Sequence, residues 1–249
     1  MYLILITSIL GISFAIGFAA SGIWNKNSAQ WKAFPTFYTF LPAVISILVF
    51  HFLQRTWSFG YLSFYKFDLV YIAAGIVIPL VVFIVNVFLM RFVFHYQMKD
   101  GIDWRKSILE LPLNVLLILI FIAGEEIGWR GFLQKLLIDE FGVVTGIVIL
   151  GLVWGIWHAP IALKGFNMGS HFWAEAFILY PFMCVCLSMP MALITIQSGS
   201  IWPALLFHAV NNSLGGIGLM LFDRKGSLMD IVPNIVTGVL LLLPFAFFL

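Results

Sequence analysis

The chain has 249 residues, of which 62% are hydrophobic and 10% are charged, and its formal net charge is +2. A soluble domain carries about 25% charged residues, so this composition excludes a soluble globular protein and indicates an integral membrane protein. The small net charge, without a basic arm or a run of like charges, argues against a nucleic-acid partner.

A helix that crosses a membrane needs about 20 apolar residues. Eight segments meet this requirement, at residues 2–21, 35–53, 69–94, 108–138, 143–163, 173–197, 200–221 and 231–249. The connections between them are too short to hold a soluble domain. We therefore predict an all-α fold, in which residues 1–249 form a single integral-membrane domain, a polytopic bundle of about eight transmembrane helices.

The fourth segment contains the most informative polar residues, in the run Gly124-Glu125-Glu126-Ile127-Gly128-Trp129-Arg130. An ionisable group at membrane depth costs about 2.5–3.5 kcal/mol on insertion scales, so such groups usually mark function. Glu126 and Arg130 are spaced i,i+4 and are predicted to form an intrahelical ion pair. Glu125 diverges from Glu126 by about 100° and is predicted to face polar groups of other helices. The alternative is a structural charge cluster, or a helix end at the membrane interface.

Two further polar clusters follow on separate apolar segments. Trp154 and His158 are spaced i,i+4 in the fifth segment, so both lie on one helix face, where the indole can stack beside the imidazole. His208 and Asn212 share a face of the seventh segment in the same way, and both can donate a hydrogen bond to one oxygen. A histidine near the end of a span can instead be a simple interfacial anchor.

Glycines accompany these clusters at a spacing that lets helix backbones approach closely. Gly-x-x-x-Gly pairs occur at 124/128, 142/146 and 151/155. Close packing of the helices around the polar groups is therefore expected. Asn86, on another span, has no polar partner nearby in sequence and is predicted to form a hydrogen bond between helices.

The polar residues together suit hydrolysis of an amide. A carboxylate and a histidine can activate water as a general base, and a second histidine with an asparagine can stabilise the oxyanion of a tetrahedral intermediate. The rival assignment is a catalytic zinc ion held by Glu125, His158 and His208. A metal-free site is favoured, because asparagine is a poor zinc ligand and a good oxyanion donor.

The three motifs resemble those of the CAAX protease and bacteriocin-processing (CPBP, or Abi) family of intramembrane proteases. The family pattern is Glu-Glu-x-x-x-Arg, then aromatic-x-x-x-His, then His-x-x-x-Asn or Asp, and this chain has all three in that order. The second motif has Trp154 where phenylalanine is common. The resemblance covers about Leu111 to Met220, which suggests a motif-bearing protease core at about 108–221.

The resemblance also implies a fold and a set of roles. It implies an eight-helix core with the active site in an intramembrane cavity. Glu125 and His158 would activate the water, and His208 and Asn212 would hold the oxyanion. Two supporting residues, Glu126 and Arg130, would orient the catalytic helix.

The expected function is therefore that of an intramembrane endopeptidase that hydrolyses a bond in a membrane-associated peptide or protein. Its partners would be the lipid bilayer and that substrate, without nucleic acid, and its location the bacterial cell membrane, which it would cross several times. Two alternatives belong to other classes: a non-catalytic membrane protein acting as an immunity factor or scaffold, and a transporter that uses the buried carboxylates as a proton relay.

Overall fold

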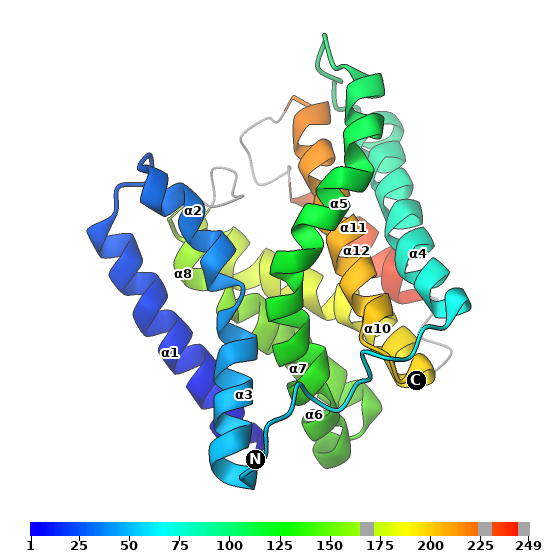
Figure 1. Ribbon diagram of the computed structural model, residues 1–249. Coiled ribbons are helices and arrows are strands. Elements are labelled where there is room, and N and C mark those ends of the chain that lie inside the picture. The colour runs from blue at the N-terminus through cyan, green and yellow to red at the C-terminus, as the bar shows by residue number, and fades with distance from the viewer. Residues whose placement is uncertain (165–171, 224–230, 244–249) are drawn as a thin grey trace.

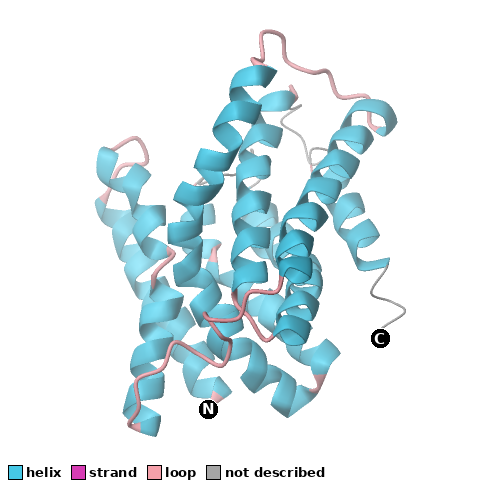
Figure 2. Cartoon of the chain, turned by 45° about the vertical axis from the view of Figure 1, so that its right-hand side comes forward, coloured by secondary structure: helices cyan, strands magenta, loops and turns pink. Residues whose placement is uncertain are grey.

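The computed structural model describes residues 1–164, 172–223 and 231–243. Over these ranges the chain is a bundle of helices (Figure 1), and its longer loops lie at the two ends of the bundle (Figure 2). The helices are α1 (Tyr2–Ile23), α2 (Ala29–Tyr38), α3 (Leu41–Gln54), α4 (Leu69–Phe88), η1 (Leu89–Val93), α5 (Trp104–Glu126), η2 (Ile127–Leu133), α6 (Gln134–Phe141), α7 (Val143–Trp157), α8 (Ala159–Ala162), α9 (Phe172–Ala174), η3 (Glu175–Leu179), α10 (Tyr180–Ser198), α11 (Trp202–Leu221) and α12 (Val232–Leu242). The three η elements are wider π-helical turns.

The predicted polytopic helical bundle is confirmed. In the described part of the chain, six helices are long and apolar enough to cross a membrane, and the bent pair α2–α3 raises this number to seven. The prediction of about eight spans differs from the structure at two segments. The second segment bends by 43° between α2 and α3, since Pro42 in the first turn of α3 cannot continue a preceding helix. The last helix, α12, has 11 residues, and residues 244–249 lie outside the described ranges.

Local sequence signals account for several helix ends. The Asp68 side chain accepts a hydrogen bond from the Val70 backbone N–H at the start of α4, and Asp103 accepts one from Lys106 at the start of α5. These carboxylates satisfy donors that have no partner within the helix. At the other end of a span, Gly199 stops α10 with a φ of 62°, which glycine adopts without a steric cost.

The predicted close packing at the glycine pairs is found on α7. A Cβ atom added at Gly151 would lie 2.4 Å from the Val185 Cα, and one at Gly155 would lie 2.2 Å from the Pro181 Cα. Any side chain at these two positions would therefore push α7 away from α10. Gly146 makes a similar approach to the α6 backbone, whereas Gly142 has open space around it and serves the α6–α7 turn with a φ of 79°.

Gly124 and Gly128 bring the polar segment against the bend between α2 and α3. A Cβ atom at Gly124 would lie 2.6 Å from the Phe40 Cα, and one at Gly128 would lie 2.5 Å from the Pro42 Cβ. On the next turn, the Gly131 carbonyl accepts a hydrogen bond from the Tyr61 backbone N–H in the α3–α4 loop. These contacts fix the position and rotation of the helix that carries both glutamates.

Candidate active site

A buried ion pair lies where α5 continues into η2. The Arg130 Nη1 donates to the Glu126 Oε1 at 3.0 Å, and neither side chain has any exposed surface. The pair predicted from the i,i+4 spacing is therefore present. In a low-dielectric core each charge requires its partner, since removing either one leaves an uncompensated ion.

His208 on α11 joins this pair. Its Nδ1 lies 2.7 Å from the Glu126 Oε1, which is the same oxygen that accepts from Arg130. A carboxylate oxygen accepts and cannot donate, so this contact places a proton on Nδ1 of His208. Glu126 thus links the first and third sequence motifs, which are 82 residues apart.

Glu125 is held by a different partner. Its Oε2 accepts a hydrogen bond from the Trp154 indole N–H at 2.8 Å, and the side chain is buried. Glu125 therefore faces a polar group of another helix, as predicted, and Glu126 does so as well, since it reaches His208. The two glutamates diverge around α5, so each one meets a different helix.

Trp154 was predicted to lie beside His158, but it also contacts other residues of the site. The Arg130 Cζ lies 4.3 Å from the centre of its ring, which is a cation–π distance. The His208 ring meets it edge-on at 5.0 Å, while the His158 ring is farther away at 6.2 Å. Trp154 therefore lies among all three motifs.

His158 is half-buried at the end of α7. Its Nδ1 lies 2.9 Å from the Trp154 backbone oxygen, and its ring packs against Tyr180 at 4.8 Å. A carbonyl only accepts, so the proton of neutral His158 lies on Nδ1 and the lone pair lies on Nε2. This orientation leaves Nε2 as a proton acceptor, as a general base requires.

Asn212 is the predicted site residue with the fewest contacts. Its side chain is exposed, and its one hydrogen bond within the described chain comes from Asn211 at 3.4 Å. The structure therefore does not bring Asn212 into hydrogen-bond contact with Glu125, His158 or His208. An exposed amide on the His208 helix is still able to bind a ligand.

Helix α10 contributes residues that the sequence analysis missed. The Arg130 Nη2 donates to the Ser188 Oγ at 3.1 Å and contacts the Met191 Sδ at 3.4 Å. Further along both helices, the Gln134 side chain donates to the Thr195 hydroxyl at 3.1 Å. Small polar residues are common in apolar helices, so the sequence offered no signal that Ser188 supports the site.

In the zinc alternative, the Nε2 atoms of His158 and His208 and the Oε1 atom of Glu125 would be the ligands, since other atoms of these side chains are engaged. Glu125 is engaged by Trp154, while the Nδ1 atoms of His158 and His208 are engaged by a carbonyl and by Glu126. Among the described residues, no three histidine, cysteine or acidic side chains are grouped so that they could hold a metal ion.

Replacing Trp154 by phenylalanine tests the bond to Glu125. The substitution keeps an aromatic ring beside Arg130 and removes the indole N–H. A hydrogen bond to a charged group contributes about 1.5–3 kcal/mol, so we expect kcat/KM for peptide cleavage to fall by about 10- to 100-fold. Trp129→Phe is the matched control, because the buried Trp129 indole N–H has no hydrogen-bond partner among the described residues. Equal activity of the two variants would contradict the role of this bond.

These features define a polytopic helical membrane protein with a buried cluster of carboxylates, arginine and histidine. Residues 107–214 match the family model described as Type II CAAX prenyl endopeptidase Rce1-like. The chain is also 26% identical over 139 residues to lysostaphin resistance protein A of Staphylococcus haemolyticus (strain JCSC1435). That match covers 55% of this chain and 36% of the relative, so the chain matches about a third of the relative's length. The predicted resemblance is confirmed, since residues 107–214 are similar to the CAAX prenyl endopeptidase family.

Proposed function

We propose that this protein is an intramembrane endopeptidase that hydrolyses a peptide bond in a membrane-associated peptide or protein. The observation that carries the proposal is the contact of His208 with the buried Glu126–Arg130 pair. It joins two sequence motifs of a CAAX protease-type core through side chains that are costly to bury. Such a cost is typical of a catalytic centre.

The proposed reaction uses two pairs of residues. Glu125 and His158 together remove a proton from the attacking water, and Nε2 of His158 is free to accept it. His208 and Asn212 donate hydrogen bonds to the oxyanion that forms on the scissile carbonyl. Because Nδ1 of His208 already contacts Glu126, the ring atom of His208 that remains for the oxyanion in this proposal is Nε2.

A digestion experiment tests the proposed activity. Wild-type protein in nanodiscs is incubated with a library of short hydrophobic peptides in water enriched in oxygen-18, and the products are identified by mass spectrometry. We expect new carboxyl termini that carry the heavy oxygen, with a shared pattern of residues around the cut. A library that is left intact, although it includes membrane-inserted peptides, would contradict the proposal.

Metal removal provides a further prediction. We expect cleavage to continue at an unchanged rate after dialysis against EDTA or phenanthroline, since the proposed steps use only side chains of this chain. The measurement is the initial rate before and after chelation, with a zinc-dependent protease treated in parallel as the control. Loss of activity that zinc restores would overturn the metal-free assignment.

A non-catalytic role is the second candidate, and the relative's name favours it because that name describes resistance to lysostaphin. Under this alternative, a resistance phenotype conferred by this chain would survive both Glu125→Gln and His208→Ala. Under the proposed protease function, both variants would lose it.

A further inference from the structure

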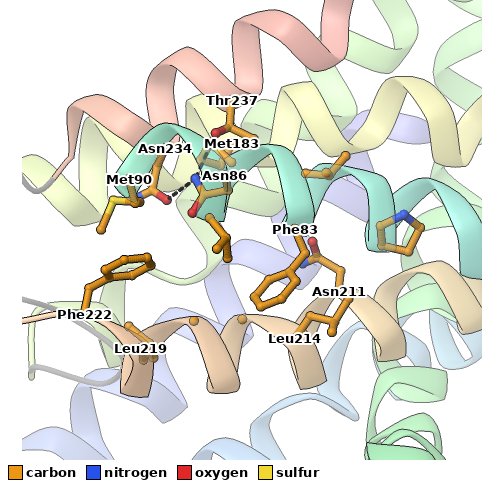
Figure 3. Close-up of a pocket in the computed structure, with 15 residues that line it drawn as sticks. Phe83, Asn86, Met90, Met183, Asn211, Leu214, Leu219, Phe222, Asn234 and Thr237 are labelled. Carbon is orange, nitrogen blue, oxygen red and sulfur yellow. Dashed lines mark hydrogen bonds between the residues drawn. The ribbon is translucent and has the colours of Figure 1, made fainter. Parts of the chain in front are cut away.

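A cavity beside α11 lies next to the candidate active site but is not used by the proposed chemistry. It has a volume of about 150 Å³ and lies between α4, α10, α11 and α12. Figure 3 shows Phe83, Asn211 and Leu214 at one end of it and Met90 and Phe222 at the other. Since its walls belong to apolar helices of the bundle, a ligand would enter it from the bilayer or from the active site.

The cavity is lined by residues of α11, the helix that carries His208 and Asn212. Gly215 lines it and follows His208 by seven residues, which is about two helical turns, so both residues lie on nearly the same face. Asn211 also lines it and donates its side-chain hydrogen bond to Asn212, the proposed oxyanion donor. A chain bound at Asn212 would therefore have the cavity residue Asn211 beside it.

Two glycines keep the cavity open. A Cβ atom added at Gly215 would meet no atom within 4 Å, and one at Gly218 would lie 3.5 Å from the Phe83 ring. Neither glycine is needed for close contact with another backbone, in contrast to Gly151 and Gly155. Larger side chains at Gly215 or Gly218 would instead occupy the space that a ligand would fill.

The lining specifies the chemistry of the occupant. No charged side chain is found among the described residues that line the cavity, and most of them are aliphatic, aromatic or methionine. Of its polar residues, Asn86 is already engaged, since its amide donates to Thr237 at 2.8 Å and to Asn234 at 3.4 Å. This is the interhelical role predicted for Asn86, and it joins α4 to α12. The Asn211 amide, by contrast, has one side-chain hydrogen bond within the described ranges, the long bond to Asn212.

We infer that this cavity binds the apolar segment of the substrate that adjoins the scissile bond, an assignment that rests on the proposed protease function. A cavity of about 150 Å³ accommodates a group of about the size of benzene, which corresponds to one large apolar side chain of that segment. The Asn211 amide is placed to bind one backbone group of that segment, and a backbone group within a membrane needs such a partner. The substrate class is therefore a peptide with a large, uncharged, apolar side chain close to the cut on one side.

The test compares two peptides with the same cleavage position. One peptide carries the apolar flank, and the other ends just beyond the scissile bond. The readout is the ratio of their kcat/KM values for wild type, Gly215→Leu and Gly11→Leu. Gly11 lies on α1 with no atom within 4 Å of its added Cβ, so it is a matched control for a new leucine in an open position. Gly218→Leu is a second filling variant, for use if Gly215→Leu does not fold.

We expect the long-to-short ratio to fall at least tenfold in the filling variants, since the loss of one well-filled apolar subsite changes discrimination by about 10- to 200-fold. The ratio should stay at the wild-type value in Gly11→Leu. An unchanged ratio in the filling variants, or an equal fall in Gly11→Leu, would overturn the inference. Wild type that cuts neither peptide would instead contradict the proposed protease function.

A binding measurement tests the proposed role of the cavity separately from the proposed protease function. The long peptide, with a photoreactive group in its apolar flank, is crosslinked to the Glu125→Gln variant, and the attachment sites are mapped by mass spectrometry. Attachment to Phe83, Leu214 or Leu219 supports the inference even without turnover. Attachment only elsewhere, as would result if a lipid chain fills the cavity, overturns it.

Discussion

Glu125→Gln is expected to lower kcat/KM for peptide cleavage by about two to four orders of magnitude, the usual contribution of a general base. The glutamine side chain has nearly the same shape and retains an oxygen that can accept from the Trp154 indole N–H. The local packing is therefore kept while the proton acceptor is lost. The rate should fall mainly through kcat, because the substrate still binds.

The folded state of this variant must be measured alongside its rate. We expect the thermal midpoint of purified Glu125→Gln to match that of wild type, since burial of the neutral side chain removes a charge and keeps its hydrogen bond. Trp129→Phe serves as the active control in the same nanodiscs. Cleavage at a rate within a factor of about two of wild type, far below the change that loss of a general base produces, would remove Glu125 from the proposed role.

Glu126→Gln is expected to produce the largest loss of stability. The substitution leaves the Arg130 guanidinium buried without its carboxylate partner, and breaking a buried pair in this way costs about 3–5 kcal/mol. The value should lie near 3 kcal/mol, because Ser188 and the Trp154 ring still contact the guanidinium. The free energy of unfolding is measured by SDS titration in mixed micelles.

A double-mutant cycle identifies the cause of that loss. If the unpaired charge is responsible, Glu126→Gln combined with Arg130→Met should be more stable than Glu126→Gln alone, since no buried charge is left. The double variant should still be inactive, because His208 has lost the carboxylate that orients its Nδ1. Additive losses of stability would contradict a direct interaction between Glu126 and Arg130.

Features that depend on one helix could be predicted from the sequence. The i,i+4 spacing of Glu126 and Arg130 predicts an ion pair regardless of how the bundle packs, and the pair is present. The apolar lengths likewise predicted where the spans lie, and the small residues at Gly151 and Gly155 predicted the close approach of another helix. Each of these signals is local in the chain.

Contacts between helices could not be predicted in the same way. Whether Glu125 or Glu126 meets His208 depends on the rotation of α5 against α11, which no sequence spacing specifies. The wider turns of η2 begin directly after Glu126 and change the helical phase of the residues that follow. Ser188 was missed for a related reason, since only the packing of α10 brings its hydroxyl to Arg130.

The most direct test of the proposed role of Glu125 measures the cleavage of one peptide by wild type and by Glu125→Gln. Both proteins are used at equal concentrations of folded protein in the same nanodiscs. Mass spectrometry detects the two product fragments over time. Wild type is expected to give fragments from a single cut, and Glu125→Gln is expected to give the same fragments at least about 100-fold more slowly. The same fragments formed at similar rates by both proteins would contradict hydrolysis by a water molecule that Glu125 activates.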